Sequence, residues 1–281
     1  MTLRIDAHQH FWHYQPQEYG WISQQMTRLK RDFLPSHLAA ELAAQQIDGC
    51  VAVQARQTLE ETHWLLSLAE RNPEIKAVVG WIDLQQPDLS AQLETCGGNP
   101  LLRGFRHLIQ DEADPAEWMA QAAIKPAMQT LQQQGYVWDL LVTHRHLAEA
   151  ALFAAQFDRH QIVLDHLGKP DLAAGAKQWA KQIAPLAALP HVSCKLSGLL
   201  TEPRPAGYGA NDLLPFVEAA LEAFGSERIM VGSDWPVSLL DAEYQESWQF
   251  VQQAVSPLTL SEQAAITGGN ACRIYRLEDG I

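Results

Sequence analysis

Basic residues are few in this sequence. Its 281 residues include 20 Lys and Arg against 33 Asp and Glu, which gives a formal net charge of −13. A protein that neutralises nucleic-acid phosphates needs a basic face, so we expect no nucleic-acid partner. The acidic balance does not restrict a small-molecule substrate, because a local basic pocket can exist in an acidic protein.

Cysteines and long apolar runs are scarce as well. The four cysteines form no C-x-x-C pair, which argues against a zinc ribbon or a disulfide framework; they are Cys50, Cys96, Cys194 and Cys272. We interpret them as small buried thiols in a reducing compartment. No apolar run reaches the ~20 residues that span a bilayer, and no long apolar segment of the secretory type occurs near residue 1. We expect a soluble, cytoplasmic protein without a membrane partner.

Several common catalytic motifs are missing. There is no G-x-S-x-G, so a Ser-based α/β-hydrolase triad has no support. Neither G-x-x-x-x-G-K-[ST] nor a strand-following G-x-G-x-x-G is present, so no nucleotide or other organic cofactor is indicated.

Short apolar segments alternate with helix-like segments along the whole chain. Hydrophobic residues make up 47% of it, enough for a sizeable core. The candidate strands resemble strands buried on both faces and cover residues 3–8, 50–54, 76–82, 102–107, 137–142, 162–166, 192–197 and 228–234. Between them lie Ala-, Leu-, Glu- and Gln-rich segments with helical apolar spacing, such as SHLAAELAAQQ and HLAEAALFAAQF.

Eight strands at a spacing of roughly 30–35 residues favour an α/β (β/α)8 TIM barrel over a doubly wound sheet. No Ser/Gly-rich linker divides the sequence, so we predict a single domain over residues 1–281.

Three strand-to-helix connections are long. They cover residues 11–33, 108–124 and 198–211, and in a barrel they would rise on the C-terminal face, where active sites of this fold lie. We predict that they cover a pocket. The first is rich in Trp, Tyr and Phe and suits an apolar wall or lid; the alternatives are a packed surface loop or a contact between copies in a homo-oligomer.

Polar residues gather at the predicted strand ends. The first strand runs into IDAHQH, where alternation predicts one shared face for Asp6, His8 and His10. The others follow later strands: Gln54 on the second, Arg106 and His107 on the fourth, His166 on the sixth, Lys195 on the seventh and Asp234 on the eighth. We interpret the other seven histidines as surface or packing residues: His13, His37, His63, His144, His146, His160 and His191.

Four of these side chains form a candidate catalytic and metal-binding set: His8, His10, His166 and Asp234. Three neutral nitrogens and one carboxylate suit a divalent ion such as Zn²⁺ with a bound water. Asp234 could instead stay off the metal and take a proton from water as general base. A metal-free site is also coherent, with Asp234 activating water while histidines and a cation polarise a carbonyl.

Structural interpretations stand beside these functional ones. His166 could bond a backbone carbonyl, and Asp234 could cap a helix ahead of WPVS, where Pro236 suits the first turn. Arg106 and Lys195 could belong to an internal ion-pair network of the barrel.

The sequence resembles the amidohydrolase superfamily and, within it, the amidohydrolase-2 branch of sugar-lactone hydrolases of the L-fuconolactonase type. The matching stretches run from residue 4 to about residue 275 and include IDAHQHFW, LRGFRH, VLDHLGKP, CKLSGL and VGSDWPV. The resemblance implies a (β/α)8 barrel that hydrolyses a cyclic ester, and it carries the site onto His8, His10, His166 and Asp234.

One departure from the wider superfamily bears on the metal. Strand five reads VWDLLV, without the histidine that many members have there, and strand four ends in Arg106 and His107 instead of a bridging residue. We therefore expect at most one divalent ion, with zinc the first choice.

The leading hypothesis is a lactonase in which water activated by Asp234 attacks a small sugar lactone. His166, Arg106, His107 or Lys195 would hold the carbonyl oxygen or sugar hydroxyls, Gln54 would add a substrate contact, and Trp12, Trp81 and Trp235 would form apolar walls. The alternatives are a metal-dependent decarboxylase of the same branch and a non-catalytic barrel that binds sugar acids.

Overall fold

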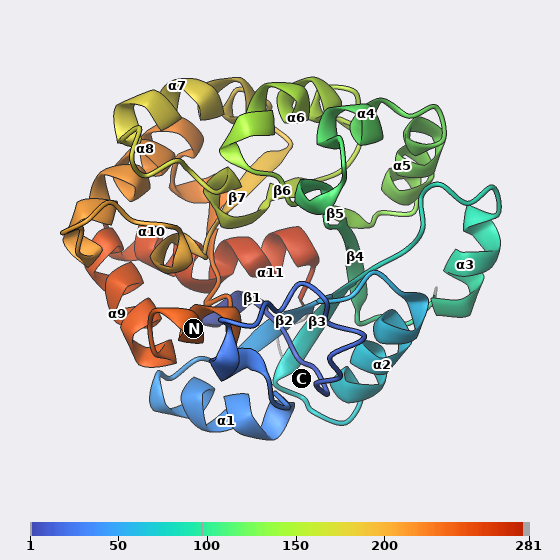
Figure 1. Ribbon diagram of the computed structural model, residues 1–281, viewed down its shortest axis with the longest axis horizontal. Helices are drawn as coiled ribbons and strands as arrows, with labels where there is room; N and C mark the ends of the chain where they lie inside the picture. The colour runs from blue at the N-terminus through green and yellow to red at the C-terminus, as the bar shows by residue number, and fades with distance from the viewer. Residues whose placement is uncertain (1, 97, 278–281) are drawn as a thin grey trace.

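The computed structural model describes residues 2–96 and 98–277, in which eight parallel strands form one sheet in sequence order (Figure 1). The strands are β1 (Ile5–Gln9), β2 (Gly49–Val53), β3 (Ile75–Gly80), β4 (Leu102–His107), β5 (Val137–Leu140), β6 (Ile162–Leu164), β7 (Val192–Leu196) and β8 (Ile229–Val231). Helices alternate with the strands and surround the sheet, so the predicted (β/α)8 barrel is confirmed.

Several strands are shorter than the sequence predicts, and two of them, β6 and β8, bear on the site. β6 ends before His166 and β8 ends before Asp234, because these residues have positive φ angles of 52° and 57°. A left-handed backbone cannot continue a strand, and for residues other than glycine it is uncommon. Both side chains therefore leave sharp turns at the mouth of the barrel.

The barrel closes where the end of β8 meets β1. His10 N donates to Trp235 O at 2.7 Å, and Asp234 N donates to His8 O at 2.8 Å. The approach is so close that a Cβ added at Gly232 would lie 2.4 Å from His8 Cβ. Closure thus positions Asp234 directly beside the two histidines of β1.

Outer helices and one inner helix complete the domain. The outer ones are α1 (Pro35–Ala44), α2 (Leu59–Ala69), α3 (Leu89–Cys96), α4 (Pro115–Ala120), α5 (Ile124–Gln133), α6 (Leu147–Ala154), α7 (Ala176–Ala187), α8 (Leu214–Phe224), α9 (Tyr244–Val255) and α10 (Leu260–Ala264). α11 (Asn270–Tyr275) instead packs Ile274 and Tyr275 against apolar side chains inside the barrel, among them Val51 and Val79. The polar candidate residues lie at the opposite end of the barrel, where the strands end.

A bulge in β1 decides which of its side chains face inward. The pairing with β2 advances three residues from Asp6 to Gln9 while the partner strand advances two, from Cys50 to Ala52. His8 consequently faces the barrel interior, whereas the Asp6 carboxylate accepts hydrogen bonds from Ser233 and from Tyr244 of α9. The prediction that Asp6 shares a face with His8 and His10 is wrong, because one extra residue reverses the alternation.

Within the described ranges, 2–96 and 98–277, no helix combines the length and apolar character needed to cross a membrane.

Candidate active site

A cavity of about 310 Å³ opens at the C-terminal ends of the strands. Its polar lining includes His10, Arg106, Gln110, His166, Lys169 and Asp234. Its apolar lining includes Trp21, Met26, Leu141 and Val237. The first two long loops supply Trp21, Met26 and Gln110, as expected for loops that cover a pocket.

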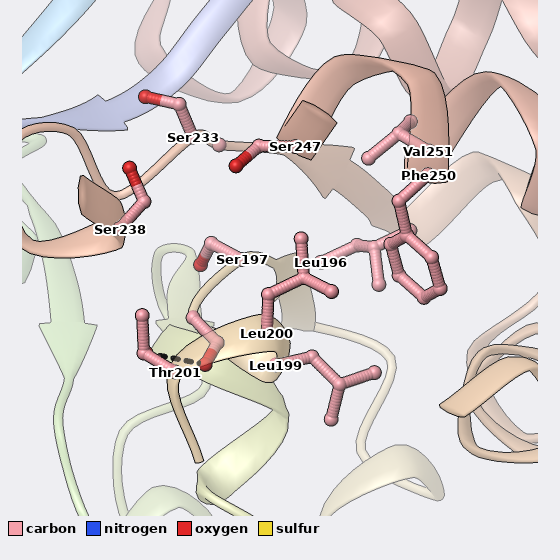
Figure 2. Close-up of a pocket in the computed structure, with 12 residues that line it drawn as sticks. Leu196, Ser197, Leu199, Leu200, Thr201, Ser233, Ser238, Ser247, Phe250 and Val251 are labelled. Carbon is pink, nitrogen blue, oxygen red and sulfur yellow. Dashed lines mark hydrogen bonds between the residues drawn. The ribbon is translucent and has the colours of Figure 1, made fainter. Parts of the chain in front are cut away.

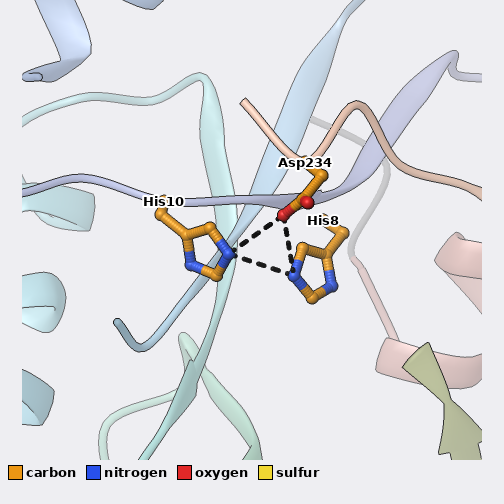
Figure 3. Close-up of side chains that lie close together, drawn as sticks. All are labelled: His8, His10 and Asp234. Carbon is orange, nitrogen blue, oxygen red and sulfur yellow. Dashed lines mark hydrogen bonds and ion pairs between the residues drawn. The ribbon is translucent and has the colours of Figure 1, made fainter. Parts of the chain in front are cut away.

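His8, His10 and Asp234 lie close together (Figure 3), and His10 and Asp234 line this cavity. The two histidine Nε2 atoms lie 3.2 Å apart. Asp234 Oδ1 lies 3.3 Å from His10 Nε2 and 3.7 Å from His8 Nε2. Each residue is at least 95% buried, so bulk water does not screen these contacts.

His166 adds a third imidazole on the same side. Its Nε2 lies 3.9 Å from Asp234 Oδ1, and its ring centre lies 4.5 Å from that of His8. Its Nδ1 is hydrogen-bonded to Ser197 Oγ at 2.8 Å, which fixes the ring with Nε2 toward the site. The side chain therefore bonds a hydroxyl and not the backbone carbonyl of the structural alternative.

The geometry of the three closest ligand atoms fits a tetrahedral metal ion. Metal–ligand bonds of about 2.0–2.2 Å in a tetrahedron separate ligand atoms by about 3.3–3.5 Å. The observed separations are 3.2, 3.3 and 3.7 Å. The second group with metal-binding potential, His8, Asp165 and His166, uses a carboxylate already engaged by Arg106 and Lys195, which favours a single ion.

Outer contacts orient the ligands as a metal site requires. His10 Nδ1 donates to Val53 O at 2.7 Å, which leaves a lone pair on Nε2. His8 Nδ1 faces Asp165 Oδ1 at 3.3 Å, and Arg106 Nη1 donates toward His8 Nε2 at 3.3 Å. The two Nε2 atoms lie 3.2 Å apart, and Lys195 Nζ lies 3.1 Å from His8 Nδ1, so each ring nitrogen of His8 has a cationic donor within reach.

The charge states also suit a cation. Burial lowers the pKa of His166 to about 4, with Asp234 and Asp165 opposing it. Burial likewise places the pKa of His8 well below its usual value. Burial alone would raise the pKa of Asp234, but the neighbouring His166, a hydrogen bond from His10 and the neighbouring His8 outweigh it and hold the pKa well below its usual range. The site combines two imidazoles of lowered pKa, His8 and His166, with one ionised carboxylate.

Buried charges below the floor form an ion-pair network. Lys195 pairs with Asp139 and, at 3.1 Å, with Asp165. Arg106 pairs with Asp165 at 3.0 Å and donates to Gln54 O at 2.5 Å. The network that the sequence offered as the alternative for Arg106 and Lys195 is confirmed. Of the two cations, only Arg106 also lines the cavity.

Sequence reasoning did not identify the two acids of this network. Asp165 stands next to His166 in LDH, and Asp139 is the one charged residue of β5, in VWDL. An acid inside an otherwise apolar barrel strand must have a buried partner, and that signal could have found both.

Some predicted substrate contacts lie away from the cavity lining. Gln54 is fully buried and donates from Nε2 to Arg106 O at 3.2 Å, so its side chain supports β4. His107 stacks on Trp118, and its Nε2 meets Glu112 at 2.6 Å. Trp81 donates to His107 Nδ1 at 3.1 Å and lines a separate surface hollow.

The predicted tryptophan walls are placed differently as well. Trp12 is fully buried, packs on Tyr19 and Phe33, and donates to Arg31 O at 2.9 Å. Trp235 packs on Phe11 and Phe33 beneath the loop. Trp21, from the same aromatic loop, lines the cavity and donates to Ala55 O at 3.0 Å.

The predicted alternative for Asp234 is not what the structure shows. The short helix that follows begins at Val237 without a side-chain cap, and the Asp234 carboxylate faces the histidines. Its backbone carbonyl accepts a hydrogen bond from Ser238 N at 2.9 Å, which holds the turn.

A second, small cavity of about 20 Å³ lies behind Ser197 (Figure 2). The hydroxyls of Ser197, Ser233, Ser238 and Ser247 and several apolar side chains line it. Its volume suits about one water molecule and is too small for a sugar. It belongs to the support of His166 and Asp6, not to substrate binding.

Comparison with known proteins agrees with this geometry. A family model described as amidohydrolase matches residues 5–277. The L-fucono-1,5-lactonase of Burkholderia multivorans is 45% identical, over 99% of this chain and 97% of that protein. That of Burkholderia ambifaria is 38% identical with the same coverage. The crystal structure of an amidohydrolase from Burkholderia multivorans with bound zinc has 44% identity and a TM-score of 0.94, over 98% of this chain and 100% of that one.

Proposed function

This chain belongs to the amidohydrolase family, and we infer that it is a lactonase, a hydrolase that opens the cyclic ester of a sugar acid. The resemblance predicted from the sequence is thereby confirmed. The observation that carries the activity is an ionised, buried carboxylate, Asp234, which lies beside His8 and His10 and lines the cavity.

The finer proposal is a six-membered lactone of a 6-deoxy sugar acid, of the L-fucono-1,5-lactone kind. Relatives with 45% and 38% identity carry that activity. The cavity volume of about 310 Å³ falls in the range of small-molecule sites. Met26, Leu141 and Val237 offer an apolar surface to a methyl group, while Gln110 offers a partner to a hydroxyl.

Asp234 is the proposed general base. It is ionised at neutral pH, and its carboxylate lines the cavity, so it can accept a proton from a water molecule that attacks the lactone carbonyl. Because its pKa is low, Asp234 is a weak base, and the attacking water must itself be made more acidic.

His8, His10 and, through Oδ1, Asp234 are the proposed metal ligands, with His166 as a fourth; the second carboxylate oxygen of Asp234 is the one proposed to accept the proton. A divalent ion bound there supplies positive charge that acidifies water and polarises the carbonyl. The protein supplies the orientation: Val53 O, Asp165 and Ser197 hold the three rings, and Trp21, fixed by its bond to Ala55 O, lines the cavity.

Arg106 and His166 are the proposed partners of the substrate oxygens. Both line the cavity next to Asp234. Arg106 is held by Asp165 and Gln54 O, so its guanidinium is preorganised and needs no rearrangement during the reaction.

A lactone-panel assay on metal-analysed protein tests this function. The protein is offered aldono-1,5- and aldono-1,4-lactones in a weakly buffered pH-indicator assay, with and without added Zn²⁺ or Mn²⁺. Acidification with a 6-deoxy aldono-1,5-lactone supports the proposal. No hydrolysis of any lactone in either condition contradicts it; CO₂ release from an aromatic acid would identify the decarboxylase alternative, and thermal protection without turnover the binding alternative.

A further inference from the structure

We propose that Lys169 binds the negative charge that hydrolysis creates on the lactone carbonyl and that the product keeps as a carboxylate. The inference rests on the proposed lactonase function and adds to it the residue that recognises the anion. Lys169 follows β6 in the sequence LDHLGKP, three residues after His166, and it lines the cavity.

Lys169 differs from the other cation of the cavity lining in being unpaired. Its Nζ forms no hydrogen bond and no ion pair within the described part of the chain. Arg106, in contrast, is neutralised by Asp165, and Lys195 below the floor is neutralised by Asp139 and Asp165. Of the Lys and Arg side chains in the described lining of the cavity, Lys169 is therefore the one without a carboxylate partner.

The backbone of Lys169 is held firmly although its side chain is free. Its carbonyl accepts a hydrogen bond from His144 Nδ1 at 2.9 Å, and its N–H donates to His166 O at 2.8 Å. His144, predicted to be an ordinary packing residue, thus clamps this turn.

The turn itself is strained. His166, Leu167, Gly168 and Lys169 have consecutive positive φ angles of 52°, 54°, 66° and 49°. Three of the four are not glycine, and left-handed backbone is unfavourable for such residues. Strain of this kind persists where surrounding structure enforces it, commonly at functional sites. Here it directs both His166 and Lys169 into one cavity.

The charge balance of the reaction gives Lys169 its role. Water forms a new C–O bond to the carbonyl carbon and passes a proton to Asp234; the ring C–O bond then breaks, and the ring oxygen leaves as a hydroxyl after regaining a proton. The carboxylic acid formed loses one proton to solvent. The lactone is neutral, whereas the tetrahedral intermediate and the product are anionic, so a cation stabilises both more than it stabilises the substrate.

Glu202, on the third long loop, is an acid that interacts with this charge. Burial raises the pKa of Glu202, and Lys169 opposes that shift, although the described residues show no ion pair between the two.

Binding of two matched compounds tests the proposal without requiring turnover. The probes are L-fuconate and L-fucitol, in which a hydroxymethyl group replaces the carboxylate. Calorimetry is run on the native protein, Lys169→Met, Lys169→Arg and, as control, Lys177→Met at an exposed position of α7. We expect Lys169→Met to weaken L-fuconate about 10- to 100-fold and L-fucitol less than about threefold. Lys169→Arg and Lys177→Met should bind both nearly as the native protein does.

Equal weakening of both compounds by Lys169→Met, or no weakening of L-fuconate, overturns the inference. In turnover, Lys169→Met should lower kcat and leave the KM for the neutral lactone nearly unchanged; a change in KM alone also overturns it. If the native protein hydrolyses no lactone, the proposed function fails by a separate measurement, while the binding comparison still decides the role of Lys169.

Discussion

His8 and His10 point their Nε2 atoms at each other across 3.2 Å. Val53 O accepts a hydrogen bond from His10 Nδ1, so His10 Nε2 carries a lone pair. His8 Nδ1 contacts both Asp165 and Lys195, and either a proton on His8 Nε2 or a metal ion bound between the two Nε2 atoms makes their short contact favourable. The same arrangement places Asp234 Oδ1 within 3.7 Å of each nitrogen, which completes three corners of a tetrahedron.

Zinc should therefore stabilise the native protein and fail to stabilise His10→Ala. At a free concentration about 100 times its Kd, a bound ion adds about 2.7 kcal/mol to the free energy of unfolding. Thermal or urea unfolding with zinc and with a chelator measures the difference. His63→Ala, at an exposed position of α2, is the control and should respond as the native protein does. Equal stabilisation of His10→Ala would remove His10 from the ligand set.

Asp234→Asn should abolish most turnover while the fold persists. The substitution removes the carboxylate that accepts the proton, and loss of a general base typically costs about 10²–10⁴-fold in rate. Asparagine tolerates the left-handed φ of 57° at this position, so circular dichroism should be unchanged. Asp241→Asn, in the same segment and half-exposed, is the matched control. Activity retained above a tenth of native would exclude Asp234 as the base.

The fold was predictable because the signal repeats eight times. Each strand is an apolar run and each intervening helix has its own periodicity, so an error in one element does not change the architecture. The pair His8 and His10 followed from the same logic. Asp6 did not, because the bulge in β1 inserts one residue that no pattern announces.

Which cation stays free is a property of the assembled barrel. Arg106, Lys195 and Lys169 all follow or end strands, but the acids that neutralise the first two come from β5 and the turn after β6. The choice of Trp21 over Trp12 as the cavity wall likewise depends on the path of residues 11–33 across the mouth. Sequence spacing carries neither piece of information.

Acidification should destabilise the metal-free protein through His166. Its pKa is about 4 in the folded protein against an ordinary value of 6.5, so below pH 6.5 the unfolded chain binds a proton that the folded protein does not. Stability is unaffected above that pH and falls progressively as the pH drops from 6.5 to about 4. At pH 5 the loss from this group is about 2 kcal/mol.

Urea unfolding of the chelator-treated native protein and of His166→Asn, each at pH 7 and pH 5, isolates this contribution. The native protein should lose about 2 kcal/mol more than the variant between the two pH values. Other titrating groups, including His8, are present in both proteins and largely cancel. Identical losses would show that His166 is not held neutral by burial.

Gly198→Ala should damage the site far more than Gly207→Ala, although both glycines lie in the third long loop. Both have positive φ angles, 66° and 86°, so an alanine strains the backbone in each case. A Cβ at Gly198 would lie 2.8 Å from His166 Nδ1, whereas a Cβ at Gly207 meets nothing within 4 Å. Only the first substitution pushes His166 away from Ser197, and displacement of a catalytic side chain by about 1 Å can reduce turnover about 100-fold.

Comparison of kcat/KM and of the free energy of unfolding for the two variants separates the effects. Similar stability losses with a large activity loss only in Gly198→Ala support the assigned position of His166. Equal activities of the two variants would contradict it.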